Sequence, residues 1–331
     1  MTKAASVAKK STTVRSFRRL VFGSVRLAFA VLERVAPTLG GWWAERLWFT
    51  PQSSGRRGTV VPSAQGHRFE VYVHGRRMVG ENWGAGPVVY LLHGWGGHRG
   101  QLGAFVDPLV AAGYRVVSVD ATSHGESAHG DAGPGRSTIL EFTDVLDAVC
   151  VAKGPAHAVI AHSIGCMATA VAVRNRLRVR RLVFIAPMGD IRPYTKEFSR
   201  RAGFGERVRA NMVRRIEHRV ALPLSHFEVA SIAKEVDTPP LLLVHDRTDN
   251  ETNWADSRAI ADAWPDARLH STNDLGHNRI LQDPDVVAEI VSFVVDTDAA
   301  ESPSAGAAEG LRQLASPRTF TPERDVLSGR R

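Results

Sequence analysis

The chain has 331 residues, of which 44% are hydrophobic and 23% are charged, and its formal net charge is +8. This composition excludes a wholly disordered chain and allows a large core in one large domain or two smaller ones. The two cysteines, Cys150 and Cys166, lie in apolar sequence without metal-ligand spacing, which argues against a disulfide framework or a zinc site and fits a reducing, cytoplasmic location.

The positive charge is concentrated at the N-terminus. Residues 1–60 contain eleven Lys or Arg but only Glu33 and Glu45, a net charge of +9, so the remaining residues sum to −1. Binding to duplex nucleic acid usually needs a cationic body. We therefore expect no nucleic-acid partner, and we interpret residues 1–58 as a basic, Trp-rich N-terminal helical arm.

Two short helices are predicted in this arm, around Leu20 to Val35 and Trp42 to Phe49. Charged residues within the first apolar stretch, such as Arg26, argue against a signal peptide or a spanning helix. Two interpretations of the arm remain open. Its apolar residues either cover the body of the protein or, within residues 15–50, lie in an anionic membrane interface on the cytoplasmic side.

Beyond residue 58, strands alternate with helices. A hairpin-like alternation in residues 67–73 and 76–83 turns at Gly75. Near-continuous Val, Ile and Leu runs separated by helical stretches predict a mostly parallel α/β sheet with helices on both faces. The expected strands are residues 88–92, 114–119, 156–161, 181–185, 241–244 and 267–270, and the helical stretches between them include 137–152 and 165–174.

Residues 188–236 interrupt this alternation and are too many for an ordinary connection. Their helical spacing predicts an inserted helical cap, which divides the core into residues 59–187 and 237–297. The arginines of the cap form either a solvated helix face or a surface that attracts an anionic substrate. From residue 298 to 331 the sequence is rich in Ala, Ser, Gly, Pro and Glu, which predicts a disordered tail.

The most informative motif is the stretch from Val159 to Cys166, in which an apolar strand leads into Ser163 and then Gly165. This is the pattern of a sharp strand-turn-helix elbow that presents a nucleophilic hydroxyl. A serine after a strand is more commonly a helix N-cap. The nucleophile interpretation requires a base and a carboxylate. His277 and Asp249 follow later strands, whose carboxyl ends share one edge of a parallel sheet.

The order Ser, Asp, His on this alternation resembles the α/β-hydrolase fold family, as a serine esterase or lipase-like member, over about residues 66–296. Residues 93–97, His-Gly-Trp-Gly-Gly, resemble its oxyanion loop, and residues 120–127 resemble its Asp-x-x-x-His-Gly-x-Ser turn. The resemblance implies that Ser163 is the nucleophile, His277 the base and Asp249 the orienting acid. It also implies an oxyanion hole formed by the backbone amides of Trp95 and Ile164.

Some positions depart from the family pattern. Ala161 stands two residues before the serine, where the family usually has glycine, and we expect this small side chain to be tolerated. Asp246 stands where the family often has glycine and is an alternative acid. Asp190 is a second alternative, because some members take the acid from the strand before the cap.

The remaining histidines are given structural roles. His93 is expected to shape its loop, and His162, His245 and His270 to make local hydrogen bonds or packing contacts. The spacing of His98, His124 and His129 does not suggest a metal site.

We therefore expect hydrolysis of a small-molecule carboxylic ester through an acyl-serine intermediate, without a cofactor or metal. The same triad would serve a thioesterase, an acyltransferase or a peptidase. An alternative from a different class is a non-catalytic, membrane-associated binding protein of hydrolase ancestry. The substrate stays open, because fold-level analogy does not select one.

Overall fold

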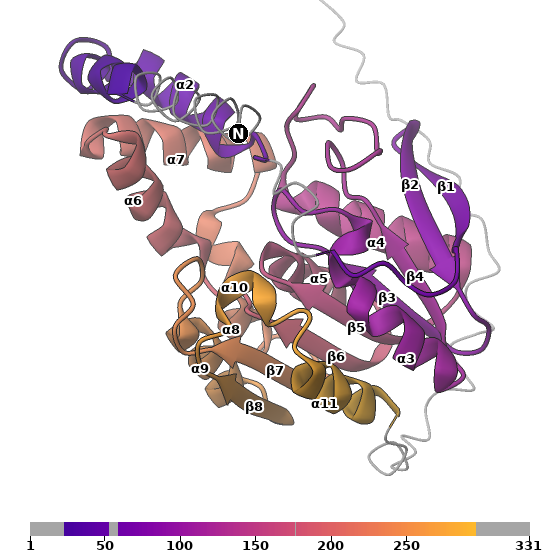
Figure 1. Cartoon of the computed structure of the whole chain (residues 1–331). Helices are drawn as coiled ribbons and strands as arrows, with labels where there is room; N and C mark the ends of the chain where they lie inside the picture. Colours follow the sequence, from indigo (N-terminus) through magenta and orange to yellow (C-terminus); the bar gives the residue numbers. More distant parts are fainter. Residues whose placement is uncertain (1–22, 53–58, 176, 296–331) are drawn as a thin grey trace, which may run out of the picture. The chain divides into compact units, whose positions relative to one another are not determined.

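An eight-stranded sheet is the centre of the computed structural model, which describes residues 23–52, 59–175 and 177–295 (Figure 1). The strand order is β1-β2-β4-β3-β5-β6-β7-β8; β2 runs antiparallel to β1 and β4, and the other neighbouring pairs are parallel. This confirms the predicted α/β class. The strands are β1 (His67–Val73), β2 (Arg76–Trp83), β3 (Val88–Leu92), β4 (Arg115–Val119), β5 (Ala156–His162), β6 (Val179–Ile185), β7 (Leu241–Asp246) and β8 (Ala267–Thr272).

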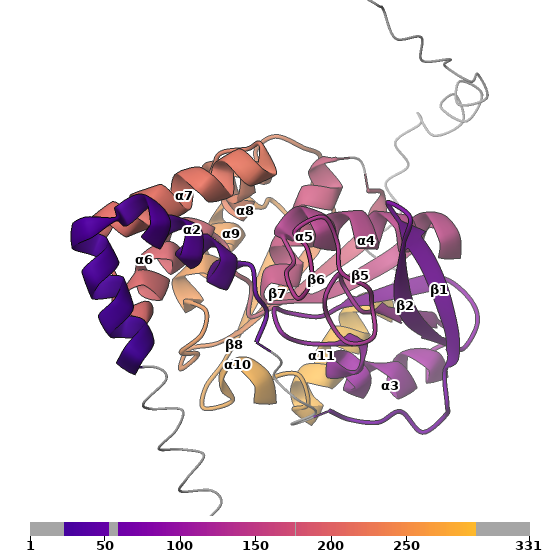
Figure 2. The same ribbon diagram turned by 90° about the horizontal axis from the view of Figure 1, so that it is seen from above.

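The central strands are buried on both faces, as their continuous apolar runs predict. Every residue of β3 and β7 is buried. Side chains that alternate along these strands divide between two hydrophobic clusters, one per face. α4 (Ile139–Lys153), α5 (Ile164–Arg174) and α9 (Trp254–Ala263) supply the first cluster, whereas η1 (Arg99–Phe105), α3 (Val106–Ala111) and α11 (Pro284–Val295) supply the second (Figure 2).

The segment between β6 and β7 is helical. It contains α6 (Ile191–Ala202), α7 (Glu206–Val220), η2 (Leu224–Phe227) and α8 (Val229–Ile232). We refer to these elements as the cap. The domain boundaries expected at residues 188 and 236 stay predictions. The expected tail, residues 298–331, lies outside the described residues, as do residues 1–22 of the arm.

The described part of the arm packs on the cap. It consists of helical residues 23–35 and of α2 (Pro37–Trp48), and α2 lies along α7 (Figures 1 and 2). Gly40 and Gly41 permit this close approach, because a Cβ on Gly41 would lie 2.4 Å from the Asn211 Cβ. The arm reaches the body at its end, where the Phe49 carbonyl accepts a hydrogen bond from the Ser137 amide. Phe29, Ala44 and Phe49 of the arm are buried in the same hydrophobic cluster as side chains of the cap and the body, so part of the apolar surface of the arm is covered by the rest of the chain.

Polar contacts fasten the arm to the cap as well. The Glu33 carboxylate accepts hydrogen bonds of 2.9–3.0 Å from the amides of Gly205, Arg207 and Val208 at the start of α7. It therefore caps that helix and complements the positive end of its dipole. The buried Glu45 carboxylate forms 2.6 Å ion pairs with Arg215 and Arg219.

The cap arginines are paired with protein groups. Arg200 and Arg201 contact Glu197, and Arg209 contacts Glu206, through helical spacings of three or four residues. Besides Arg215 and Arg219, Arg207 donates to backbone carbonyls of the arm and Arg214 to the Asn211 side chain. These pairs favour the interpretation of the cap arginines as a solvated helix face over that of a surface that attracts an anionic substrate. Among the described helices, none is long and apolar enough to cross a membrane.

Candidate active site

Ser163 occupies the turn between β5 and α5 with φ 55° and ψ −121°, in the left-handed region that favours glycine. The turn is tight. A Cβ at Gly165 would lie 2.7 Å from the carbonyl oxygen of His93, so only glycine fits there. Ser163 stands at the N-cap position, yet its hydroxyl makes no capping hydrogen bond. A strained residue that does not cap its helix argues against the plain N-cap interpretation.

His277 and Asp249 meet although they lie on different loops. Asp249 follows β7, and His277 lies on the short α10 (Gly276–Arg279) after β8. The Nδ1–H of His277 donates to Asp249 Oδ2 at 2.7 Å, and the side chain of Asp249 is fully buried. The backbone amides of Glu251 and Thr252 donate to the other carboxylate oxygen, at 2.7 and 3.1 Å. The carboxylate is therefore held in one orientation toward the ring.

The pKa of Asp249 reflects these contacts. Burial acts to raise it, but hydrogen bonds from His245 and His277, followed by the charge of His277, outweigh burial and hold the pKa well below its ordinary value. Asp249 is thus ionised and can only accept hydrogen bonds.

The two alternative acids have other partners. Asp246 accepts hydrogen bonds from the Thr248 amide and hydroxyl, the Thr272 hydroxyl and the Leu275 amide, so it ties together the loops after β7 and β8. Asp190 caps α6 through the Arg192 amide and forms an ion pair with the Arg192 guanidinium. Of the three carboxylates, Asp249 is the one that accepts a hydrogen bond from the His277 ring within the described residues.

Sequence reasoning missed Thr252. Its hydroxyl donates to Asp249 Oδ2 at 3.0 Å and lies 3.2 Å from His277 Nδ1. The signal was local, because an Asp side chain commonly accepts from amides two and three residues onward, which places Thr252 beside it. His245 lies behind the same carboxylate oxygen, at 3.5 Å, and its Nδ1 is 2.7 Å from the Ser257 hydroxyl. This is a buried hydrogen-bonding histidine, as expected.

Ser163 and His277 lie in the same small region of the structure. His162, which precedes the serine, places its Nε2 3.0 Å from the His277 carbonyl oxygen. Ser163 and His277 are 6% and 7% exposed. No hydrogen bond joins the Ser163 hydroxyl to the His277 ring within the described chain, and the ring Nε2 lies 3.9 Å from Glu251 Oε2. Such serine–histidine contacts are often long without substrate and tighten when it binds.

The amides of Trp95 and Ile164 have no acceptor among the described residues. Gly94, the residue before Trp95, lies so close to the serine that an added Cβ would be 3.0 Å from Ser163 Cβ. Backbone donors without a protein acceptor next to a serine are the feature that an oxyanion site requires. The loop that carries Trp95 is anchored by two buried histidines. His93 Nε2 accepts from the Ala121 amide, and His124 Nε2 accepts from the Gly96 amide, each at 3.0 Å. His93 thus contacts the backbone of two loops, as a loop-shaping residue would.

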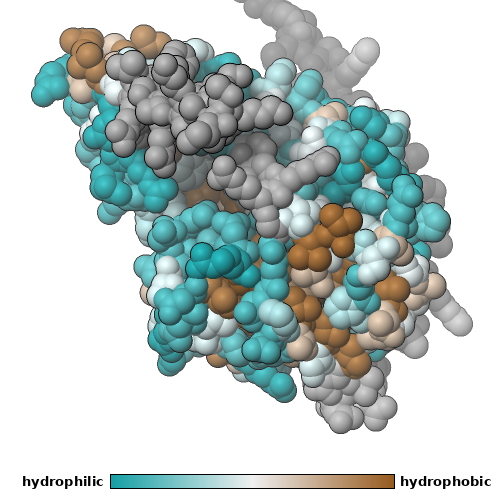
Figure 3. All heavy atoms as spheres, viewed as in Figure 1, coloured by the Kyte–Doolittle hydropathy of each residue, from teal (hydrophilic) through white to brown (hydrophobic). Residues whose placement is uncertain are grey.

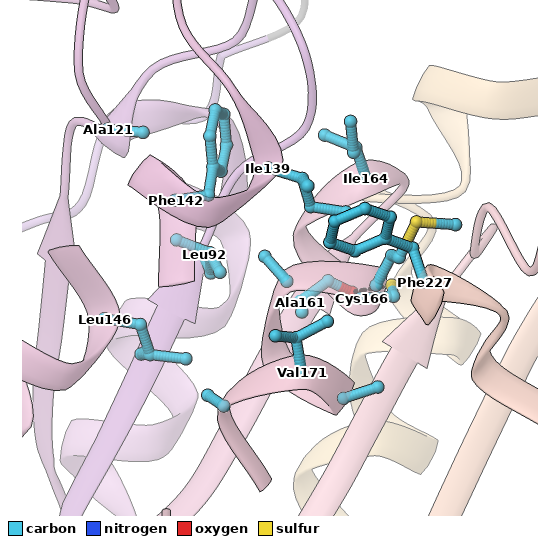
Figure 4. Close-up of a cluster of buried hydrophobic side chains, with 14 of the residues drawn as sticks. Leu92, Ala121, Ile139, Phe142, Leu146, Ala161, Ile164, Cys166, Val171 and Phe227 are labelled. Atoms are coloured by element: carbon cyan, nitrogen blue, oxygen red, sulfur yellow. Dashed lines mark hydrogen bonds between the residues drawn. The ribbon is translucent and has the colours of Figure 1, made fainter. Parts of the chain in front are cut away.

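Apolar side chains from the body and the cap meet beside the elbow. Figure 4 shows Ile139 and Ile164 next to Phe227 of η2, above the buried Cys166. All four are at most 7% exposed. Ala161 belongs to the same cluster and is fully buried, so its methyl group is accommodated where glycine was expected.

The fold and this arrangement define the class of protein. A sequence model described as the alpha/beta hydrolase family matches residues 89–290, more than half of the chain. The chain therefore belongs to the alpha/beta hydrolase family. No curated protein matches it.

Solved structures of related fold include two esterases and a thioesterase. An esterase from Thermogutta terrifontis is 19% identical with a TM-score of 0.52, over 69% of this chain and 98% of that one. An esterase from Pyrococcus furiosus is 17% identical with a TM-score of 0.54, over 71% and 97%. The thioesterase domain from the curacin biosynthetic pathway is 17% identical with a TM-score of 0.52, over 70% and 100%. At such identities the likeness shows the fold alone.

Proposed function

We propose that this chain is a serine hydrolase that cleaves carboxylic esters through an acyl-serine intermediate. Ser163 is the nucleophile, His277 the general base and Asp249 the acid that orients the base. The observation that carries the proposal is the 2.7 Å hydrogen bond from His277 Nδ1 to the buried Asp249, because it leaves Nε2 as the ring nitrogen available to a proton from Ser163. The unused amides beside Ser163 support it independently.

The mechanism follows from these groups. Ser163 Oγ attacks the acyl carbonyl carbon while His277 Nε2 takes its proton. The amides of Trp95 and Ile164 donate to the oxygen that becomes negative. When the tetrahedral intermediate collapses, His277 returns the proton to the leaving alkoxide and an alcohol departs. Water then repeats the sequence, with His277 as base again, and releases the carboxylic acid.

Asp249 acts through His277. An ionised carboxylate on Nδ1 fixes the tautomer in which Nε2 has a free lone pair, and it stabilises the imidazolium that forms in each step. The hydrogen bonds from Glu251, Thr252 and the Thr252 hydroxyl hold Asp249 in place and keep it ionised.

The experiment is hydrolysis of p-nitrophenyl esters of increasing acyl length, with matched thioesters, by wild type and by Ser163→Ala. We expect the substitution to lower kcat by at least about 10⁴-fold. A fluorophosphonate probe should label Ser163 in the wild type. Undiminished turnover in Ser163→Ala, or labelling of another residue, would reject the assignment. Absence of turnover together with absence of labelling would favour the non-catalytic alternative.

The role of Asp249 as the orienting acid is tested by comparing its substitution with that of a second carboxylate, Asp190. Asp249→Asn should lower kcat by about 10⁴-fold, because the amide favours the wrong tautomer of His277. Asp190→Asn is the control, since asparagine also caps a helix and should change kcat by less than about twofold. If the losses were reversed, Asp190 would be the acid. The ratio of ester to thioester turnover decides between an esterase and a thioesterase.

A further inference from the structure

The arm presents two different faces. One face packs on the cap, through residues such as Phe29, Gly41 and Glu45. The other is apolar but exposed. We name it the arm face, and it consists of Leu27 (69% exposed), Val31 (51%), Val35 (73%), Leu39 (54%) and Trp42 (43%). Outside the arm, the exposed large hydrophobic side chains of the described chain are fewer and lie on several elements: Val60, Val61, Tyr72, Val151 and Val295.

Helical spacing places these side chains on shared surfaces. Leu27, Val31 and Val35 follow one another at intervals of four residues, which puts them on one side of helical residues 23–35. On α2, Leu39 and Trp42 lie opposite the glycines that contact α7. In Figure 3 one of the hydrophobic patches lies at the upper left, at the outer end of the arm, and others lie over the body. An exposed apolar surface of this kind marks an interaction site.

The charges beside the arm face are positive. Residues 1–22, which precede the arm face in the sequence, contain six cations and no acidic residue. Arg34 and Arg46 are exposed on the helices themselves, and the Arg46 guanidinium lies 5.0 Å from the Trp42 ring centroid. The six cations are Lys3, Lys9, Lys10, Arg15, Arg18 and Arg19.

We infer that the arm face docks on an anionic lipid surface. The apolar side chains enter the boundary between headgroups and acyl chains, Trp42 and Arg46 lie at headgroup level, and the cations of residues 1–22 bind lipid phosphates. A second copy of this chain fits less well, because it would bring an equally basic segment to the same interface. The rest of the chain carries a net charge of −1 and offers no general attraction to such a surface.

The contacts between the arm and the cap fix the orientation of the cap relative to the lipid surface. Glu33, Glu45 and the glycines of α2 bind the arm to α7, so a lipid surface that holds the arm also holds the cap. The arm would therefore orient the cap at the membrane as well as anchor the chain to it. This conclusion does not depend on the proposed ester hydrolysis.

The test is co-sedimentation of the full chain with vesicles of phosphatidylcholine mixed with phosphatidylglycerol, and with vesicles of phosphatidylcholine alone. Wild type should bind the anionic vesicles and bind less as salt increases. The variant Leu27→Gln/Val31→Gln/Val35→Gln should bind at least about tenfold more weakly, and glutamine keeps the helix propensity high. Replacement of Lys9, Lys10, Arg18 and Arg19 by glutamine should have at least a similar effect, of about tenfold or more.

Val151→Gln is the matched control, because Val151 is 88% exposed on α4 and away from the arm. It should bind vesicles as wild type does. Equal binding to neutral vesicles, no binding to anionic ones, or equal loss in the control would overturn the inference. So would a wild-type dimer in light scattering that the triple variant dissociates, since the arm face would then bind a second copy. Vesicle binding is measured without substrate, and Ser163→Ala should bind normally, so failure of the proposed function is recognised separately.

Discussion

His162 Nε2 lies 3.0 Å from the backbone carbonyl oxygen of His277, and the two rings lie 4.5 Å apart between centroids. A carbonyl only accepts hydrogen bonds, so Nε2 of His162 carries the proton. Burial lowers the pKa of His162 well below 6.5, which keeps the ring neutral with a single proton on that nitrogen. His162, the residue before Ser163, thus holds the backbone of His277 in place.

We predict that His162 is a positioning residue. His162→Phe removes the donor and frees the backbone of His277, so kcat should fall by about tenfold while KM changes little. His162→Gln should restore most of kcat, because its amide nitrogen reaches about the position of Nε2. Steady-state kinetics on a p-nitrophenyl ester make the comparison. Equal losses in both variants, with KM rising as kcat falls, would indicate a general structural role instead.

Acidification should destabilise the protein through its buried neutral histidines. Burial lowers the pKa of His93 to about 4 and that of His124 to about 3, and both rings accept backbone hydrogen bonds at Nε2. The unfolded chain protonates them near pH 6.5, whereas the folded chain does not, so stability is complete above that pH and falls as the pH decreases toward 4. His93 alone accounts for about 3 kcal/mol.

Urea unfolding at about pH 7 and about pH 4.5 measures this loss. His124→Gln should reduce the difference between the two free energies of unfolding, because it removes a buried group that is protonated only in the unfolded chain at about pH 4.5. An unaltered difference in His124→Gln would assign the acid sensitivity to other groups.

Close approach of α2 to α7 should make Gly41 intolerant of a side chain. An added Cβ would lie 2.4 Å from Asn211 Cβ and 3.0 Å from the backbone of α7, so Gly41→Ala should destabilise the arm by about 1–3 kcal/mol. Gly23 is the matched control, since it is helical and has no atom within 4 Å of an added Cβ. Gly23→Ala should stabilise the helix by up to about 1 kcal/mol. Hydrogen exchange of the arm amides measures both, and equal protection in the two variants would contradict the packing argument.

The sequence by itself determined the features that depend on near neighbours. Apolar runs separated by helical stretches specify buried parallel strands, because a strand covered on both faces must be apolar throughout. The elbow was also readable, since the sharp turn needs Gly165 two residues after Ser163, where a Cβ would strike the His93 carbonyl. The expected strand Val88 to Leu92 has the same bounds as β3.

Only the tertiary structure decided which distant groups meet. Asp190, Asp246 and Asp249 were alternatives in sequence, and the hydrogen bond to His277 depends on how two loops from different strands are placed at one sheet edge. The position of the arm on the cap was decided in the same way, by the fit of Gly41 against Asn211 and of Glu45 between Arg215 and Arg219. Contacts of this kind join residues far apart in the chain and vary by ångströms with packing, whereas the patterns of the sequence specify only residue type and spacing.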